Sequence, residues 1–352
     1  MRIKRRKSKV VKIGKVAIGG GNPIAIQSMV KCATSDIRGV VKQIRELELL
    51  GCAIVRVAVK DLRDARAIAK IKAKIKIPLV ADIHFDRRLA LEAIACGADK
   101  IRLNPGNIYR KQDVVEIAQA AKRRKIAIRV GLNSGSLPGG SLKGRRPAES
   151  MVKSALDYLK IIESCNFYDI VISLKASNIF DTIEAYRLIS RRCDYPLHLG
   201  ITASGSFFSG IVKSSIGIGC LLLEGIGDTI RTSLTEPPHT EVETAKNILA
   251  ALGLGAFGPE VISCPTCGRC EVDLVRLVND FQRKLNASGR RLNPNLKIAL
   301  MGCVVNGPGE AAAADMGVAF GKKSGLYFKR GKAVKKVSFS KCIPVLLKEM
   351  GG

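Results

Sequence analysis

Short apolar runs alternate with amphipathic stretches from about residue 24 onward, and the alternation occurs eight times. An apolar run of four to eight residues bounded by turn residues is typical of a buried strand, whereas a 3.6-residue apolar period is typical of a helix. Helices are predicted between the strands, for example over Glu149–Glu163 and Ile179–Arg191. The predicted strands are Ile24–Met29, Ile54–Val59, Pro78–Ile83, Lys100–Asn104, Ile126–Gly131, Asp169–Lys175, Leu197–Thr202 and Asp228–Leu234.

Eight strand–helix units predict an α/β fold, a (β/α)₈ barrel of the TIM type. A doubly wound open sheet is the alternative, but no G-x-G-x-x-G run follows the first strand, which weakens a dinucleotide-binding interpretation. After Leu252 the pattern changes to a glycine-rich stretch and then to a smaller α+β domain, with a helix near Val272–Leu285 and a strand at Lys297–Gly302. We therefore expect a barrel at residues 1–252, a linker at 253–260 and a second domain at 261–352.

The 352-residue chain is 47% hydrophobic and 25% charged, which is typical of a soluble globular protein. No uncharged apolar run of about 18 residues predicts a membrane span. The N-terminal sequence MRIKRRKSKV also lacks the apolar stretch of a signal peptide. We expect a cytoplasmic protein with no membrane partner.

The formal net charge is +29, and a basic excess favours binding to the phosphates of nucleic acids. An alternative function is therefore a basic RNA-binding protein with a structural metal site. However, the basic residues are spread along the whole chain, Trp is absent and aromatic residues make up 5%. This distribution favours a generally basic surface without a dedicated nucleic-acid site.

Charged and polar side chains stand in or just after the predicted strands. Because active sites of TIM barrels lie at the carboxyl ends of the strands, we expect these side chains to converge on one rim. Guanidinium groups bind phosphate through charge-assisted hydrogen bonds, so the rim predicts a site for a phosphate or diphosphate. Asp82 and His84 are candidates for orienting a substrate or carrying protons. The cations are Arg56, Arg102, Arg129, Lys175 and Arg231, and the polar neighbours include Asn104, Asn133, Thr202 and Ser233.

Four of the 11 cysteines form two tight motifs. The run SCPTCGRC holds Cys264, Cys267 and Cys270, and MGCVVNGPGE holds Cys303. Cysteine pairs at this spacing with a distant third partner bind zinc or an iron–sulfur cluster. No second close pair of Cys or His lies near Cys303, which favours a cluster over zinc. Spacing alone would make Cys270 a fourth ligand, and the remaining alternative is a set of unrelated buried thiols.

SCPTCGR and MGCVVNGPGE together closely resemble the bacterial 4-hydroxy-3-methylbut-2-en-1-yl diphosphate synthase family of the methylerythritol phosphate route to isoprenoids. The resemblance keeps its order over nearly the whole chain, with no large insertion between barrel and cluster domain, as in the two-domain form. The other stretches that carry it are ADIHFD (Ala81–Asp86), RLNPGN (Arg102–Asn107), PLHLGIT (Pro196–Thr202), EGIGDTIRTSLT (Glu224–Thr235) and KKSGLY (Lys322–Tyr327).

The resemblance implies a [4Fe–4S] cluster bound by Cys264, Cys267, Cys303 and Glu310, with Cys270 outside the ligand set. It implies an oxidoreductase that opens the ring of 2-C-methyl-D-erythritol 2,4-cyclodiphosphate with two electrons from ferredoxin or flavodoxin. Glu310, Asp82 and His84 are then the catalytic candidates. The candidates for binding the diphosphate substrate are Arg56, Arg102, Arg129, Asn133, Lys175, Lys213, Arg231 and Ser233.

The sequence departs from the family pattern at three places. Ala203 stands where the family usually has a glutamate after G-I-T, Val30–Cys32 replaces a Thr-Asn-Thr-like run, and the loop Ser134–Pro147 is atypical. The resemblance also implies a homodimer in which the cluster domain of one subunit closes the barrel of the other. The eight-residue linker agrees with this expectation, because at about 3.3–3.6 Å per residue it spans under about 30 Å.

Overall fold

The computed structural model describes residues 3–136, 146–255, 257–287, 293, 296–304, 309 and 311–350. The chain forms two compact units, Met1–Gly255 and Ala256–Gly352. The first contains the predicted barrel, and the second contains a separate mixed sheet. The prediction of a linker at residues 253–260 remains a prediction. Within the described residues, no helix combines the length and apolar character needed to cross a membrane.

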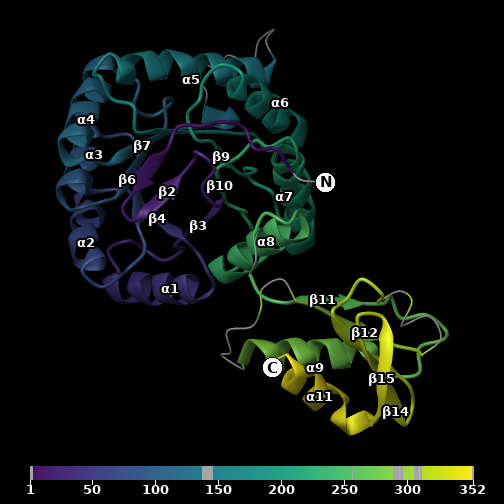
Figure 1. The fold of residues 1–352 in the computed structure, drawn as a ribbon. Coiled ribbons are helices and arrows are strands. Elements are labelled where there is room, and N and C mark those ends of the chain that lie inside the picture. The colour runs from purple at the N-terminus through teal and green to yellow at the C-terminus, as the bar shows by residue number, and fades with distance from the viewer. Residues whose placement is uncertain are drawn as a thin grey trace. The chain divides into compact units, whose positions relative to one another are not determined.

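Eight parallel strands form the barrel of the first unit, in the order β8-β7-β6-β5-β4-β3-β10-β9 (Figure 1). A bridge between Ile172 of β8 and Leu197 beside β9 joins the two ends of this order. The TIM-type barrel predicted from the sequence is therefore confirmed. The strands are β3 (Ala25–Met29), β4 (Ile54–Val59), β5 (Leu79–Ile83), β6 (Lys100–Leu103), β7 (Ala127–Asn133), β8 (Ile170–Lys175), β9 (His198–Leu199) and β10 (Thr229–Ile230).

One helix follows each barrel strand, and the helices form a ring outside the barrel (Figure 1). The side chain of Asp36 caps the first helix by accepting a hydrogen bond from the backbone N–H of Gly39 at 3.0 Å. That helix ends before Gly51, whose φ of +93° favours glycine. The helices are α1 (Ile37–Leu49), α2 (Leu62–Lys72), α3 (Arg87–Ala95), α4 (Lys111–Arg124), α5 (Pro147–Glu163), α6 (Ile179–Ser190), α7 (Phe207–Leu223) and α8 (Pro238–Ala251).

The last two barrel strands are shorter than predicted. The sequence predicted strands over Leu197–Thr202 and Asp228–Leu234, whereas each regular strand has two residues. Backbone contact continues beyond them, since the N–H of Arg231 donates to the Leu199 carbonyl at 3.0 Å. Outside that short ladder, the backbone bends into the loops at the carboxyl end of the barrel.

An N-terminal hairpin, which the sequence did not predict, closes the amino end of the barrel. It consists of β1 (Val11–Ile13) and β2 (Val16–Ile18), paired antiparallel. Its apolar side chains form a small core with residues at the starts of five barrel strands, including Ile54 and Val80. The hairpin thus covers the amino end of the barrel with apolar side chains.

Part of the basic N-terminus has a structural role. Arg5 and Arg6 both form ion pairs with the buried carboxylate of Asp228, at 3.1 and 3.9 Å. The same carboxylate accepts a hydrogen bond from the N–H of Leu197 at 2.9 Å. These contacts attach the first described residues of the chain to the barrel strands.

The second unit is a five-stranded mixed sheet in the order β11-β12-β13-β14-β15. Strands β11, β12 and β13 run parallel, and β14 and β15 complete an antiparallel meander. Phe281 of α9 and Leu346 of α11 lie in the core of this unit with Phe320 of β13. The elements are β11 (Glu260–Ser263), α9 (Leu274–Ala287), β12 (Lys297–Met301), β13 (Met316–Phe320), β14 (Ser324–Lys329), β15 (Lys332–Ser338) and α11 (Cys342–Glu349).

Candidate functional site

Strand alternation places the predicted cations inside the barrel. In β4, Val55 and Val57 belong to the core between strands and helices, whereas Ile54 packs with the N-terminal hairpin. Because side chains in a strand point alternately to its two faces, Arg56 lies on the same inner face as Ile54, one step nearer the carboxyl end. The same alternation places Asp82 of β5 and Arg102 of β6 beside it.

Asp82 holds two of these cations. Its carboxylate lies 3.1 Å from Nη1 of Arg102 and 3.6 Å from Nε of Arg56. Burial by itself would raise the pKa of Asp82, but Arg56, Arg102 and Arg129 together outweigh it and lower the pKa to about 2. Asp82 is therefore ionised at neutral pH and holds the guanidinium groups in position. Its predicted catalytic role remains a prediction.

Arg129 of β7 is the most deeply buried arginine of the group, with 1% of its surface exposed. Among the described residues, its Nε and Nη1 have no hydrogen-bond partner. Burial lowers the pKa of Arg129 well below its usual value, and the neighbouring cations Arg56 and Arg102 lower it further. A buried guanidinium with unused donors is costly unless an anion compensates it.

Lys175 lies at the end of β8, and its Nζ is 3.4 Å from Nε2 of His198 on β9. The other ring nitrogen of His198 lies 2.8 Å from Oγ1 of Thr229 on β10. Gly200 is required beside this lysine, since a Cβ there would lie 2.6 Å from the lysine Nζ and from the carbonyl of Arg231. Three neighbouring strands therefore define the position of one amine.

Two further charged residues, which the sequence did not single out, belong to the site. Lys100 of β6 is fully buried, and its Nζ lies 3.4 Å from Oε1 of Gln27. Glu241 of α8 is 2% exposed and lies 3.4 Å from Nη2 of Arg231 and 3.1 Å from Nζ of Lys31. Glu241 also accepts a hydrogen bond from the backbone N–H of Leu234 at 3.1 Å.

The interior has many more cations than carboxylates. Among the described residues, two carboxylates, Asp82 and Glu241, face six cations inside the barrel, and Glu241 also pairs with Lys31 from the loop after β3. Such an excess inside a protein favours a bound anion or loss of protons from the cations. The six cations are Arg56, Lys100, Arg102, Arg129, Lys175 and Arg231.

The other predicted substrate residues lie at the carboxyl ends of the strands or beyond. His84 follows β5 and is half-buried, and Asn133 ends β7, where its Oδ1 accepts a hydrogen bond from Oγ1 of Thr202 at 3.4 Å. Ser233 is half-buried in the loop after β10. Lys213 is half-buried in α7, and among the described residues it has no side-chain hydrogen bond or ion pair. The role of each residue remains a prediction.

The cysteine motifs meet at the carboxyl ends of two neighbouring parallel strands. Cys264 directly follows β11 and Cys303 lies just after β12, with Ser263 paired in register with Leu300. The backbone N–H of Gly302 donates to Sγ of Cys264 at 3.2 Å, so the two motifs are in contact. Such N–H···S bonds stabilise thiolate ligands and tune iron–sulfur clusters.

The remaining ligands of the predicted set are less closely placed. Cys267 is exposed and Cys303 is buried, while Glu310 lies outside the described residues. Within the described part of the chain, no three His, Cys, Asp or Glu side chains converge tightly enough to hold a metal ion. Cys270 donates from Sγ to the carbonyl of Val272 at 3.2 Å and packs against the domain core. Cys264 packs against the same core, so the exclusion of Cys270 from the ligand set remains a prediction.

Comparison with protein families decides the relationship of this chain to known proteins. A family model for the GcpE TIM-barrel domain matches residues 8–246, and a model for the GcpE protein C-terminal domain matches residues 260–351. The chain belongs to the GcpE family. The two matched segments correspond to the two compact units of the structure.

Relatives in the GcpE family match over their full length. A protein of Thermodesulfovibrio yellowstonii named 4-hydroxy-3-methylbut-2-en-1-yl diphosphate synthase (flavodoxin) is 50% identical, over 99% of each chain. A protein of Caldicellulosiruptor saccharolyticus with the same name is 54% identical over 97% of this chain and 98% of its own. The resemblance stated from the motifs is thus confirmed. A dihydropteroate synthase from Stenotrophomonas maltophilia has 13% identity and a TM-score of 0.54, covering 70% of this chain and all of that one, which shows the barrel fold alone.

The departures from the GcpE pattern have structural consequences. Ala203 adopts a left-handed conformation, with φ of +51°. Lys31 joins the loop after β3 to the loop after β10, donating to the carbonyls of Leu234 and Glu236 and pairing with Glu241. Most of the atypical loop Ser134–Pro147 lies outside the described residues.

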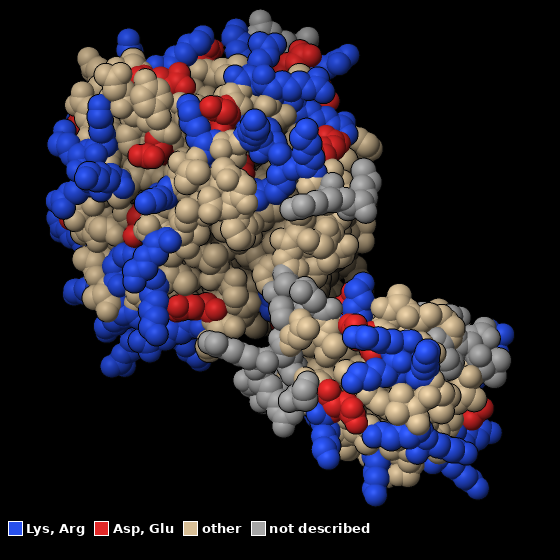
Figure 2. All heavy atoms as spheres, in the orientation of Figure 1, with Lys and Arg blue, Asp and Glu red and all other residues tan. Residues whose placement is uncertain are grey.

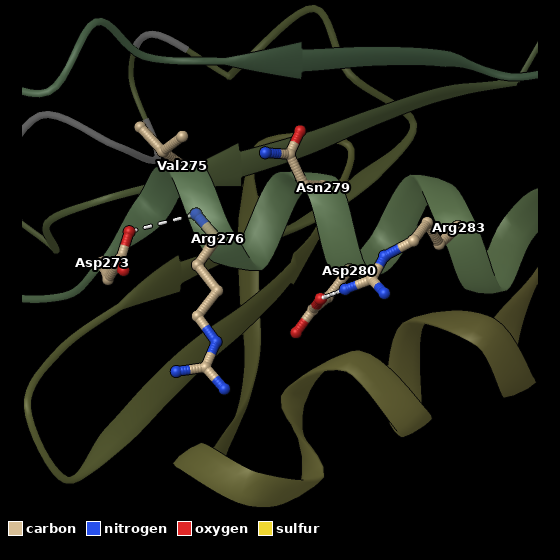
Figure 3. Close-up of a pocket in the computed structure, with 6 residues that line it drawn as sticks. All are labelled: Asp273, Val275, Arg276, Asn279, Asp280 and Arg283. Carbon is tan, nitrogen blue, oxygen red and sulfur yellow. Dashed lines mark hydrogen bonds and ion pairs between the residues drawn. The ribbon is translucent and has the colours of Figure 1, made fainter.

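The remaining surface features of this GcpE chain are less specific. Lys and Arg are scattered over the face shown in Figure 2 and do not gather in a single stripe. A shallow depression on α9 is lined by charged residues that pair locally, as Asp280 does with Arg283 (Figure 3). The depression therefore offers no converging groups comparable to those in the barrel.

Proposed function

We propose that this chain converts 2-C-methyl-D-erythritol 2,4-cyclodiphosphate to (E)-4-hydroxy-3-methylbut-2-en-1-yl diphosphate and water. The conversion opens the ring and consumes two electrons and two protons. The observation that carries the proposal is the buried excess of cations inside the barrel, with unused donors on Arg129. A cyclic diphosphate supplies the compensating charge, and full-length relatives at about half identity are named as this enzyme.

The barrel residues bind and orient the diphosphate. Arg129 and Lys175 have no carboxylate partner among the described ion pairs, so their positive charge is available to phosphate oxygens. Arg56 and Arg102 are aligned by Asp82, and Arg231 by Glu241. Asn133, Ser233 and His84 provide hydrogen-bonding groups at the strand ends, and Lys213 remains a further candidate cation.

The donor set of the second unit suits a [4Fe–4S] cluster held by Cys264, Cys267, Cys303 and Glu310. Bound there, the cluster would supply the electrons and a Lewis-acidic iron for the leaving oxygen. The thiolate of Cys264 is stabilised by the N–H of Gly302. Glu310 adds a hard oxygen donor, which binds iron more weakly than a thiolate does and can yield to a substrate oxygen.

Flavodoxin is the proposed electron donor, with ferredoxin as the second candidate. The relatives' names include flavodoxin. Such carriers are usually acidic, and opposite charge accelerates encounter at low salt. The sheet of the second unit presents exposed cations that suit an acidic partner. They are Lys322, Lys323, Lys329, Arg330, Lys332, Lys335 and Lys336. The free cysteines suit the reducing cytoplasm, which we propose as the location.

We also propose a homodimer in which the second unit of one subunit serves the barrel of the other. Helix α7 supports self-association, because Phe208, Val212 and Ile216 expose 80%, 56% and 53% of their surface along one side of it. The helix contains a single charged residue, Lys213. Two copies with a net charge of +29 each repel one another, so they are expected to meet where cations are sparse.

The dimer surface has a direct test. Val212→Glu with Ile216→Glu places like charges on both sides of an isologous contact, and sedimentation should then show monomers at concentrations where the wild type is dimeric. The matched control is Val10→Glu, another exposed apolar residue that lies outside α7. A double variant that remains dimeric would remove α7 from the interface.

The activity has an equally direct test. Protein reconstituted with iron and sulfide under anaerobic conditions is incubated with the cyclodiphosphate and reduced flavodoxin. Phosphorus NMR should show the cyclic diphosphate resonances replaced by those of a linear diphosphate. If the protein holds its cluster and leaves the substrate unchanged, under conditions in which an active relative converts it, the proposal is wrong.

A further inference from the structure

The buried contacts around His198 define the tautomer that it adopts beside a charged Lys175. An ammonium group only donates hydrogen bonds, so a charged Lys175 needs Nε2 of His198 as an unprotonated acceptor. The proton of the neutral ring is then on Nδ1, which donates to Oγ1 of Thr229. Burial lowers the pKa of His198 well below its usual value, and a charged Lys175 and Arg129 lower it further, so the ring is neutral beside the ammonium group.

The backbone of His198 is fixed as well. The hydroxyl of Tyr186, which is fully buried on α6, donates to the carbonyl of His198 at 2.5 Å. The same hydroxyl accepts a hydrogen bond from the N–H of Leu174 at 3.2 Å. The ring therefore sits on a rigid frame that links β8, β9 and α6.

Lys175 has cations on several sides. Burial lowers its pKa well below the usual lysine value, and Arg129 and Arg231 are the next largest causes. The two carboxylates of the interior, Asp82 and Glu241, form their described ion pairs with other cations. The charged or titratable groups around Lys175 on the packed elements are Arg56, Arg102, Arg129, Tyr186, His198 and Arg231.

We propose that Lys175 takes up a proton from solvent when a diphosphate enters the barrel, and that His198 is a positioning residue that accepts a hydrogen bond from the resulting ammonium group. The inference rests on the proposed substrate class. The amine gains one proton and becomes an ammonium group, and no bond of the ligand is formed or broken. Negative charge next to Lys175 offsets the surrounding guanidinium groups and so favours the charged lysine.

Calorimetric titration measures this uptake directly. The full-length protein is titrated with the cyclodiphosphate, without reductant, in buffers of different ionisation enthalpy across pH 6–9. The ligand carries one acidic oxygen on each phosphorus, both ionised in this range, so it contributes no proton change of its own. We expect an uptake that approaches about one proton per bound ligand where free Lys175 is neutral.

Three substitutions identify the group that takes up the proton. Lys175→Arg keeps a permanent positive charge, so binding should persist while proton uptake disappears. Lys175→Gln should lose both the uptake and at least tenfold in affinity. Lys153→Gln, an exposed lysine of α5, is the matched control and should leave both quantities unchanged. Uptake that persists in Lys175→Arg and Lys175→Gln would overturn the assignment.

The role of His198 is tested by the pH profile. His198→Leu removes the acceptor of the ammonium group, so the pH of half-maximal uptake should move downward. His198→Gln, whose amide oxygen can accept the same bond, should restore much of the shift. An unchanged profile in His198→Leu would remove the positioning role. Binding without any proton uptake in the wild type would refute the inference alone, whereas absence of binding would refute the proposed function.

Discussion

The interior of the barrel and the cysteine-bearing edge of the second unit both lie at the carboxyl ends of parallel strands, but their side chains are held in different ways. In the barrel, cations are buried and fixed by their neighbours, as Arg102 is by Asp82 and by the carbonyl of Gly131. At the second edge, Cys267 is exposed, and the backbone N–H of Gly302 donates to Sγ of Cys264, which brings the two motifs into contact.

The difference separates a site formed in advance from one completed by its ligand. A closed barrel fixes its inward side chains before any anion arrives, and the cost of their mutual repulsion is offset when the anion binds. Metal ligands commonly come together fully only on binding, because the metal itself contributes to folding free energy. We therefore expect substitutions in the barrel to change the affinity for the diphosphate. Substitutions at the cysteine edge should instead decide whether the cluster is bound.

The largest effect is expected at the cysteines. Cys264→Ser, Cys267→Ser or Cys303→Ser should abolish cluster binding, because a hydroxyl is a poor replacement for a thiolate ligand of iron. Iron and sulfide analysis of each reconstituted variant provides the measurement. Cys270→Ser is the matched control from the same loop and should retain the cluster. Loss of iron in the Cys270 variant would show that the ligand set includes this residue.

Mixing two inactive chains tests whether the two regions meet across a dimer. One chain carries Arg56→Ala with Arg102→Ala, and the other carries Cys303→Ser. Random exchange of equal amounts makes half of the dimers mixed, each with one intact site, so activity should return to about a quarter of the wild-type level. If mixed dimers form and stay inactive, each site is built within a single chain.

The barrel was predictable from the sequence because eight apolar runs alternate regularly with amphipathic helical stretches. Arg102 and Arg129 were also found, since charges inside apolar strands stand out. Lys100 was missed, although its position two residues before Arg102 places it on the same inner face. His198 was quoted only within the family stretch PLHLGIT and was not proposed as a site residue. Glu241 was missed because no local sequence pattern distinguishes it from the exposed acids of α8.

The ends of strands β9 and β10 and the hairpin β1–β2 were less predictable for a different reason. Regular pairing in β9 and β10 stops where the backbone enters the loops at the carboxyl end of the barrel. The apolar residues continue past that point in the sequence, so they do not mark the end of the strand. The hairpin strands have three residues each, too few to show a period. The cysteine motifs were found at once, because their spacing is unusual, but the register of β11 against β12 that joins them is a tertiary property.

A smaller effect is expected at the barrel arginines. Each charge-assisted hydrogen bond contributes roughly 1.5–3 kcal/mol, so Arg129→Met should weaken binding of the cyclodiphosphate about 10- to 150-fold without loss of iron. Because Arg129 lacks a hydrogen-bond partner for two of its nitrogens among the described residues, the ligand-free variant should be at least as stable as the wild type. Calorimetry and thermal unfolding measure the two quantities.

The matched control for the arginine variants is Arg66→Met, which removes an exposed cation paired with Glu92. It should change neither affinity nor iron content. Wild-type affinity in Arg129→Met, and likewise in Arg56→Ala, Arg102→Ala and Arg231→Ala, would place the diphosphate outside the barrel interior.

The smallest effect is expected in the pH dependence of stability. The pKa of Asp82 is about 2 in the folded protein, against an ordinary value of about 3.9. Because this pKa is lowered in the folded state, ionised Asp82 contributes to the free energy of unfolding, and the contribution is fully present above about pH 4. It is lost as the pH falls toward 2, by an amount on the order of 2 kcal/mol. Denaturant unfolding of wild type and Asp82→Asn should therefore differ most above pH 4 and converge in acid. Glu92→Gln, which breaks the exposed pair with Arg66, should change stability by no more than about 1 kcal/mol. A difference for Asp82→Asn that stays constant from pH 6 to pH 2.5 would show that this carboxylate does not hold the cations through its charge.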